Sequence, residues 1–158
     1  MKATIESSLK KSMGYVEYRE LLDNLLSQGK TTGDNHSEQM LKYAELNISR
    51  MNKWDKIFKP SEEVKKAINE IQRPELWLVI TEGWCGDAAQ NLPLLKKMAD
   101  LNDMIDFKVV LRDQNLELMD HFLTNGGRAI PKMIRIDANT LEVLGDWGAR
   151  PEAAQKIV

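Results

Sequence analysis

The chain has 158 residues, with 42% hydrophobic and 29% charged residues and a formal net charge of −2. These values predict one soluble globular domain, and the scattered basic residues argue against nucleic-acid binding or a membrane-surface role. No apolar run reaches membrane-spanning length, and the N-terminus lacks the apolar core of a signal peptide.

Residues 1–60 are predicted to be helical. Apolar residues at steps of three and four predict a helix that ends at Gly29 and another that is stopped by Pro60. Asp34 or Asn35 is expected to cap the second helix, and Ser61 to cap a third whose first turn holds two glutamates. The three predicted helices span residues 14–30, 36–58 and 61–72.

From residue 73 onward the pattern is that of an α/β unit. Buried strands are predicted at 76–81 and 105–113, helices at 87–102 and 114–127, and a final hairpin at 131–137 and 141–147. In the second of these helices, Leu116, Met119 and Leu123 are expected on the buried side. This order predicts a mixed sheet, with parallel pairing first and antiparallel pairing last. Residues 150–158 predict the opening turns of one more helix, so we expect that the sequence is trimmed at this end.

Cys85 is the only cysteine of the chain. One cysteine excludes an internal disulfide and a multi-thiolate metal site, and neither histidine has a second ligand at metal spacing. We therefore expect no metal and no cofactor. With no signal peptide, the single thiol favours the cytoplasm, where thiols stay reduced.

The position of Cys85 favours a reactive site. A buried strand is predicted to end near Thr81, and a helix to begin at or just after Cys85. Sites in α/β sheets lie outside the carboxyl ends of strands, and unpaired N–H groups at a helix N-terminus stabilise a thiolate. Gly86 leaves room for another backbone near the sulfur, and Trp84 supplies an apolar flank. Most free cysteines are buried and pack like small hydrophobic residues. The position of Cys85, between a strand end and a helix start, instead favours a reactive thiol.

Three motifs resemble those of the thioredoxin superfamily. The sequence "WCGDA" after "LVIT" resembles the family's active-site turn, W-C-G-P-C after a buried strand. The sequence "RAIPKMIRID" resembles the segment with the family's cis-proline, here Pro131, and "GDWGARP" resembles the glycine after the last strand, here Gly148. The resemblance implies a thioredoxin-like α/β fold, a central mixed sheet flanked by helices, over residues 61–158. Residues 1–60 would then be a helical extension similar to that of a bacterial thioredoxin-like subfamily built around W-C-G-D.

The resemblance also implies the site. In such a family the cis-proline lies beside the cysteine, and the residue before it offers its backbone to a bound peptide strand. The site implied here consists of Cys85 as the catalytic thiol and Trp84, Gly86, Asp87, Ile130 and Pro131 as substrate-binding residues.

Two departures from the family alter the expected chemistry. Ala88 replaces the second cysteine, and Val79 replaces the family's buried acid. Cys85 cannot form an internal disulfide, so only an outside thiol can release a mixed disulfide.

Three charged residues near the site each have two interpretations. Asp87 is expected to stabilise the helix start and, as a nearby anion, to raise the pKa of the thiol. Glu82 is either a base or specificity residue at the rim or simply solvated. Arg128 either steers an acidic partner or, more simply, covers the end of the preceding helix.

The leading hypothesis is a monothiol thiol–disulfide exchange protein, an oxidoreductase whose partner is a protein disulfide or a low-molecular-weight thiol. The alternative is a non-catalytic thioredoxin-fold module that uses the former active-site groove for peptide or subunit contacts. A single-cysteine glutaredoxin with an iron–sulfur cluster is disfavoured, because Asp87 stands where an apolar residue is expected.

Overall fold

The computed structural model describes residues 1–150 of the chain. Its helices are α1 (Lys2–Leu9), α2 (Tyr15–Ser27), α3 (Glu38–Ile57), α4 (Glu62–Asn69), α5 (Gly86–Ala99) and α6 (Leu116–Asp120), and its strands are β1 (Glu75–Thr81), β2 (Ile105–Leu111), β3 (Lys132–Asp137) and β4 (Val143–Gly148). The helix expected from residue 150 onward lies outside the described residues.

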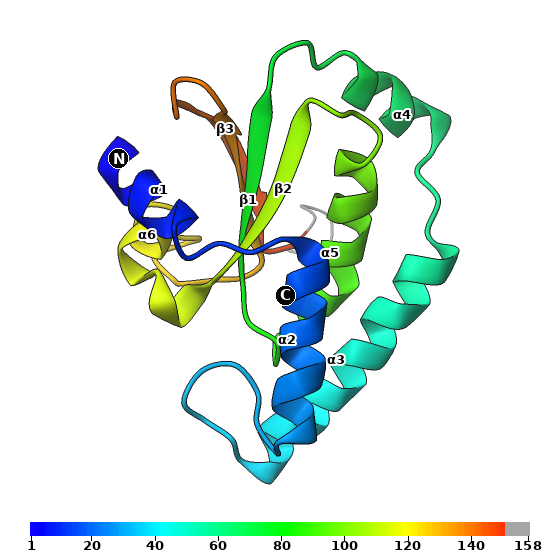
Figure 1. Ribbon diagram of the computed structural model, residues 1–158, viewed down its shortest axis with the longest axis vertical. Coiled ribbons are helices and arrows are strands. Elements are labelled where there is room, and N and C mark those ends of the chain that lie inside the picture. Colours follow the sequence, from blue (N-terminus) through cyan, green and yellow to red (C-terminus); the bar gives the residue numbers. More distant parts are fainter. Residues whose placement is uncertain (151–158) are drawn as a thin grey trace.

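The four strands form one mixed sheet in the order β2-β1-β3-β4. β1 pairs in parallel with β2 and antiparallel with β3, and β3 pairs antiparallel with β4. This confirms the predicted order of parallel and antiparallel pairing. The central strand β1 is almost wholly apolar because helices cover both faces of the sheet (Figure 1).

Alternate residues of β1 point into two separate cores, as the two-residue period of a strand requires. Trp77 and Val79 face α2, α3 and α5, whereas Leu78 and Ile80 face α1 and α6. Figure 1 shows α1 and α6 on one side of the strands and α2, α3 and α5 on the other. The thioredoxin-like architecture expected from the sequence is therefore confirmed.

The N-terminal helices contribute to the cores on both faces of the sheet. Ile5 of α1, a helix that the sequence reasoning did not predict, is fully buried among residues of the α6 side. Met13 forms a bridge with Val109 through two backbone hydrogen bonds of 2.9 and 2.8 Å at the free edge of β2. The division into an extension (1–60) and a thioredoxin-like domain (61–158) stays a prediction.

Most of the predicted helix ends are close to the observed ones. Gly29 has a φ of +71° just after α2, a left-handed conformation that glycine adopts easily, and Ser61 caps α4 by accepting from the Val64 N–H. The predicted cap of α3 was wrong: Ser37 caps it through the Met40 N–H, and Asn35 instead accepts from the Ser37 N–H.

The helix predicted over 114–127 is present, but its predicted bounds were wrong. A single turn of 3-10 helix (Arg112–Gln114) precedes α6, which ends at Asp120. Leu116 and Leu123 are exposed, while the buried apolar residues are Leu118, Met119 and Phe122. The helix stops early because the chain turns back on itself, with two backbone hydrogen bonds between Thr124 and Gly127.

Across residues 1–150, we find no helix with both the length and the apolar character needed to cross a bilayer.

Candidate functional site

Cys85 lies at the junction of β1 and α5. It is the N-cap of α5, and its own N–H donates to the Glu82 carbonyl at 3.2 Å, which closes the turn after β1. The side chain is half-buried. Its Sγ lies 3.5 Å from the Ile130 carbonyl, to which the thiol donates. The Ile130–Pro131 peptide bond is cis, which is the geometry that the resemblance implies.

Gly148 lies against this proline. It is the last residue of β4, and its φ is +134°. Residues other than glycine rarely adopt this backbone conformation. A Cβ on Gly148 would lie only 2.1 Å from the Pro131 carbonyl oxygen. The end of β4 therefore positions the loop that carries the hydrogen-bond partner of Cys85.

The pKa of the Cys85 thiol is raised above its ordinary value. Burial is the largest cause, and the charge of Asp87 raises the pKa further. The backbone N–H groups of Ala88 and Asp87, at the start of α5, lower it in part. The thiol is thus weakly acidic, in the direction expected from the sequence.

The Asp87→Asn variant is expected to lower the pKa of the Cys85 thiol. It removes the nearby negative charge, and it also frees Arg150, whose Nε donates to Asp87 Oδ2 at 2.9 Å. Both changes favour the thiolate. Titration of the thiolate by ultraviolet absorbance measures the shift, and an unchanged or higher pKa in the variant would contradict this account of the thiol.

The two family positions that are altered here are both buried. Ala88 is 2% exposed and Val79 is 0% exposed, and both belong to the core around α5. Neither supplies a thiol or an acid. The buried acid of this site is a different residue, Glu82.

Glu82 was predicted to lie at the rim, and that prediction was wrong, because it is 1% exposed. Its Oε2 accepts from the Asp113 N–H at 3.3 Å, and its Oε1 has no hydrogen-bond partner in the described part of the chain. Burial raises the pKa of this carboxyl, and the neighbouring Thr32 hydroxyl and Asp113 N–H offset part of the effect. The segment that covers Glu82, with Thr32 and Gly33, precedes it by about fifty residues in the sequence.

We expect the Glu82→Gln variant to gain stability relative to the wild type as the pH rises. A carboxyl with a raised pKa in the folded state stabilises the fold below its unfolded pKa of about 4.3, and this contribution is lost as the pH rises through the folded value. Glutamine does not titrate. Urea unfolding of both proteins, from about pH 4.3 to neutral pH, measures the difference. A difference that stays constant with pH would show that Glu82 is not held in its neutral form.

Helix α3 braces the turn between β1 and α5. The buried Asn47 donates from Nδ2 to the Gly83 carbonyl at 3.1 Å, and Arg50 Nη1 donates to Asn47 Oδ1 at 3.0 Å. On the other side, Thr32 Oγ1 accepts from the Gly83 N–H at 2.9 Å. The positions of these residues at the turn were not predicted from the sequence. One signal was present: Asn47 is three residues after Ala44 and four before Met51, on the buried face of α3.

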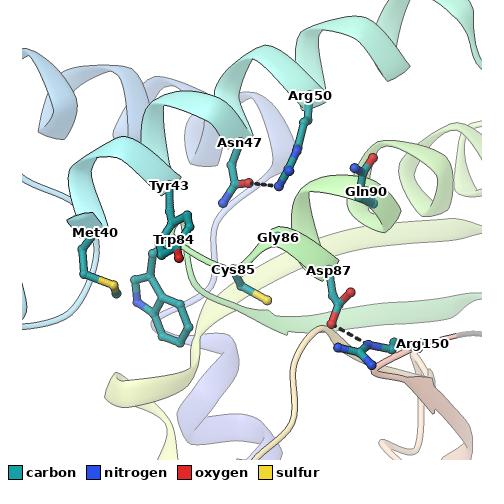
Figure 2. Close-up of a pocket in the computed structure, with 10 residues that line it drawn as sticks. All are labelled: Met40, Tyr43, Asn47, Arg50, Trp84, Cys85, Gly86, Asp87, Gln90 and Arg150. Carbon is teal, nitrogen blue, oxygen red and sulfur yellow. Dashed lines mark hydrogen bonds and ion pairs between the residues drawn. The ribbon is translucent and has the colours of Figure 1, made fainter. Parts of the chain in front are cut away.

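Two cavities meet at Cys85. The first, the α3 cavity, has a volume of about 640 Å³. It is lined by Met40, Tyr43, Asn47 and Arg50 of α3, by the turn from Trp84 to Asp87, and by Gln90 and Arg150 (Figure 2). The second, the proline cavity, has a volume of about 380 Å³ and lies on the Ile130 side, where Arg112 is placed over the Trp84 ring at 5.1 Å. Cys85, Trp84 and Asp87 border both.

The structure therefore brings Cys85, Trp84, Gly86, Asp87, Ile130 and Pro131 to one place. Arg128 forms a two-bond ion pair with Asp120, the last residue of α6, at 2.8 and 3.1 Å, and it also lines the proline cavity. Its role in steering an acidic partner stays a prediction. Among residues 1–150, no three histidine, cysteine, aspartate or glutamate side chains are grouped so that they could hold a metal ion.

Comparison with known proteins gives the class to which this fold and site belong. A thioredoxin family model matches residues 33–158, and the chain therefore belongs to the thioredoxin family. The match begins before α3, so it includes the helix that braces the turn. A search of curated proteins found no match.

Two solved structures are similar in fold. One is a protein of unknown function from Pseudomonas aeruginosa, at 19% identity and a TM-score of 0.58, with 91% of this chain and 81% of that chain covered. The other is an HIV epitope scaffold, at 19% identity and a TM-score of 0.57, with 90% and 81% covered. At this identity both similarities show the fold alone.

Proposed function

We propose that this protein carries out thiol–disulfide exchange with Cys85 as its single reactive thiol. The observation that carries the proposal is the placement of the half-buried Cys85 side chain at the N-terminus of α5, with its Sγ 3.5 Å from the carbonyl of Ile130, the residue before the cis-proline Pro131. Ala88 occupies the position of a second thiol, so the exchange uses one cysteine. A reducing compartment such as the cytoplasm suits such a thiol.

The reaction has two balanced steps. The Cys85 thiolate attacks one sulfur of a disulfide, the S–S bond breaks, and a mixed disulfide forms while the other half leaves as a thiol with the proton from Cys85. A second thiol then attacks the mixed disulfide, which restores the Cys85 thiol and releases a new disulfide. The protein itself gains and loses no net electrons.

The surroundings of Cys85 support both steps. The N–H groups at the start of α5 stabilise the sulfur as attacking anion in the first step and as leaving group in the second. Trp84 and Gly86 flank the sulfur, and Ile130, which precedes Pro131, lines the proline cavity, where a peptide substrate would dock. The partner is a protein disulfide or a low-molecular-weight thiol.

Intact-mass measurement tests the proposal. The reduced protein is incubated with oxidised glutathione, and the expected product carries one glutathione, located on Cys85 by peptide mapping. The same incubation in denaturant shows that the cysteine itself is competent. A folded protein that stays unmodified, while the denatured chain is modified, would count against the exchange function.

One observation favours a second candidate, a non-catalytic binding module: burial raises the pKa of the Cys85 thiol. Under this alternative the two cavities hold a peptide or a subunit. The Cys85→Ser variant would then keep its partner binding and its cellular function.

A further inference from the structure

We propose that the α3 cavity binds a small disulfide or thiol that carries a carboxylate, with Arg50 as the carboxylate ligand and Cys85 as the reacting thiol. This inference rests on the proposed function. It narrows the substrate class, because a residue of α3 would then select the molecules that react with Cys85.

The size and lining of the cavity suit a small molecule. Its volume of about 640 Å³ lies within the range of roughly 300–1,000 Å³ that is usual for ligand pockets. Met40 and Tyr43 of α3 lie across from Trp84 of the turn, and these side chains offer contacts to an aliphatic body (Figure 2). Tyr43 is 45% exposed, so its ring is available to a ligand.

The described residues that line the α3 cavity carry more positive than negative charge. Asp87 is the only carboxylate among the lining residues that belong to the described part of the chain, and Arg150 pairs with it. Arg50 takes part in none of the ion pairs within residues 1–150, and its described hydrogen bond goes to the neutral Asn47 amide. Within residues 1–150, the cavity therefore has an arginine whose charge is not matched by any carboxylate of its lining.

Arg50 is also held close to the reactive end of α5. Asn47 fixes it from one side, since the same amide donates to the Gly83 carbonyl. On the other side, Arg50 Nη1 lies 3.1 Å from the place where a Cβ on Gly86 would be, next to Cys85 in sequence. A guanidinium offers paired donors that match a carboxylate, so Arg50 is suited to hold the acidic end of a molecule whose sulfur reaches Cys85.

With such a substrate, Cys85 attacks the sulfur nearer to it, and the S–S bond breaks. The half that stays on Cys85 as a mixed disulfide has its carboxylate at Arg50. The other half leaves as a thiol and takes the proton that Cys85 gives up.

The test compares two disulfides of similar length, the dianionic dithiodipropionic acid and the neutral hydroxyethyl disulfide. Rate constants for adduct formation on Cys85 are measured by intact mass, and the quantity of interest is their ratio, acid over neutral. The variants are Arg50→Gln, Arg50→Lys, and the control Arg73→Gln, an exposed arginine outside the α3 cavity.

In Arg50→Gln the ratio is expected to fall about tenfold or more, because the variant loses one charge-assisted interaction with the carboxylate; a tenfold fall corresponds to about 1.4 kcal/mol. Arg50→Lys keeps the charge without the paired donors and should give an intermediate ratio. Arg73→Gln should keep the wild-type ratio. In the wild type the ratio should also fall as salt is added, a result that needs no variant to fold.

A ratio that neither the Arg50 variants nor salt changes would overturn the inference and leave the exchange function intact, since adducts still form. A folded protein that forms no adduct with either disulfide would overturn the exchange function, and the inference with it.

Discussion

The Cys85→Ser variant is expected to lose disulfide exchange completely, with no mixed disulfide from any disulfide partner. A thiolate is the attacking group in exchange, and a serine hydroxyl is neither ionised at neutral pH nor able to form an S–S bond. Intact-mass measurement and a glutathione-coupled exchange assay show the loss.

The fold of this variant should survive, because the Cys85 side chain donates one weak hydrogen bond, at 3.5 Å to the Ile130 carbonyl. The expected change in the free energy of unfolding is about 1 kcal/mol or less. Near-ultraviolet circular dichroism and urea unfolding serve as controls. A well-folded Cys85→Ser protein that still speeds up exchange would show that the reactive group lies elsewhere.

The largest expected effect on stability is that of Gly148→Ala. The added Cβ would lie 2.1 Å from the Pro131 carbonyl oxygen, on a backbone with a φ of +134°. Either the strand end or the proline loop must shift, which we expect to cost about 3 kcal/mol or more. Urea unfolding gives the change in the free energy of unfolding.

Gly145→Ala is the matched control in the same strand. A Cβ there would meet no atom within 4 Å, and its φ is not in the left-handed region. Its free energy of unfolding should change by about 1 kcal/mol or less. Equal effects at Gly145 and Gly148 would contradict the view that β4 holds the proline loop in place. Any folded Gly148→Ala protein should also react more slowly at Cys85, because Ile130 would be displaced with Pro131.

The sheet could be predicted from the sequence because its signals are local. The apolar run before Cys85 marks a strand covered on both faces, and the hairpin at the end has short strands around a turn. The early end of α6 could not be predicted, because its length depends on the contacts of the following turn between Thr124 and Gly127. The helix α1 has a single strongly apolar buried residue, Ile5, which is too weak a pattern.

The site was predicted only in part, for a similar reason. Cys85, Ile130 and Pro131 lie in motifs that resemble those of a family, so their approach was expected. The burial of Glu82 depends on Thr32 and Gly33, and the cavity wall depends on Arg50, all distant in the sequence. No local pattern indicates which loop covers an acid or which helix faces a thiol.

Turnover of a preformed mixed disulfide tests the central claim most directly. The protein is loaded with one glutathione on Cys85, freed of excess reagent and mixed with reduced glutathione, and its intact mass is followed in native buffer and in denaturant. We predict that the folded protein returns to the free-thiol mass and releases one oxidised glutathione per chain, because the backbone N–H groups at the start of α5 stabilise the Cys85 thiolate as it leaves. A folded adduct that persists, while the denatured adduct is released, would contradict it.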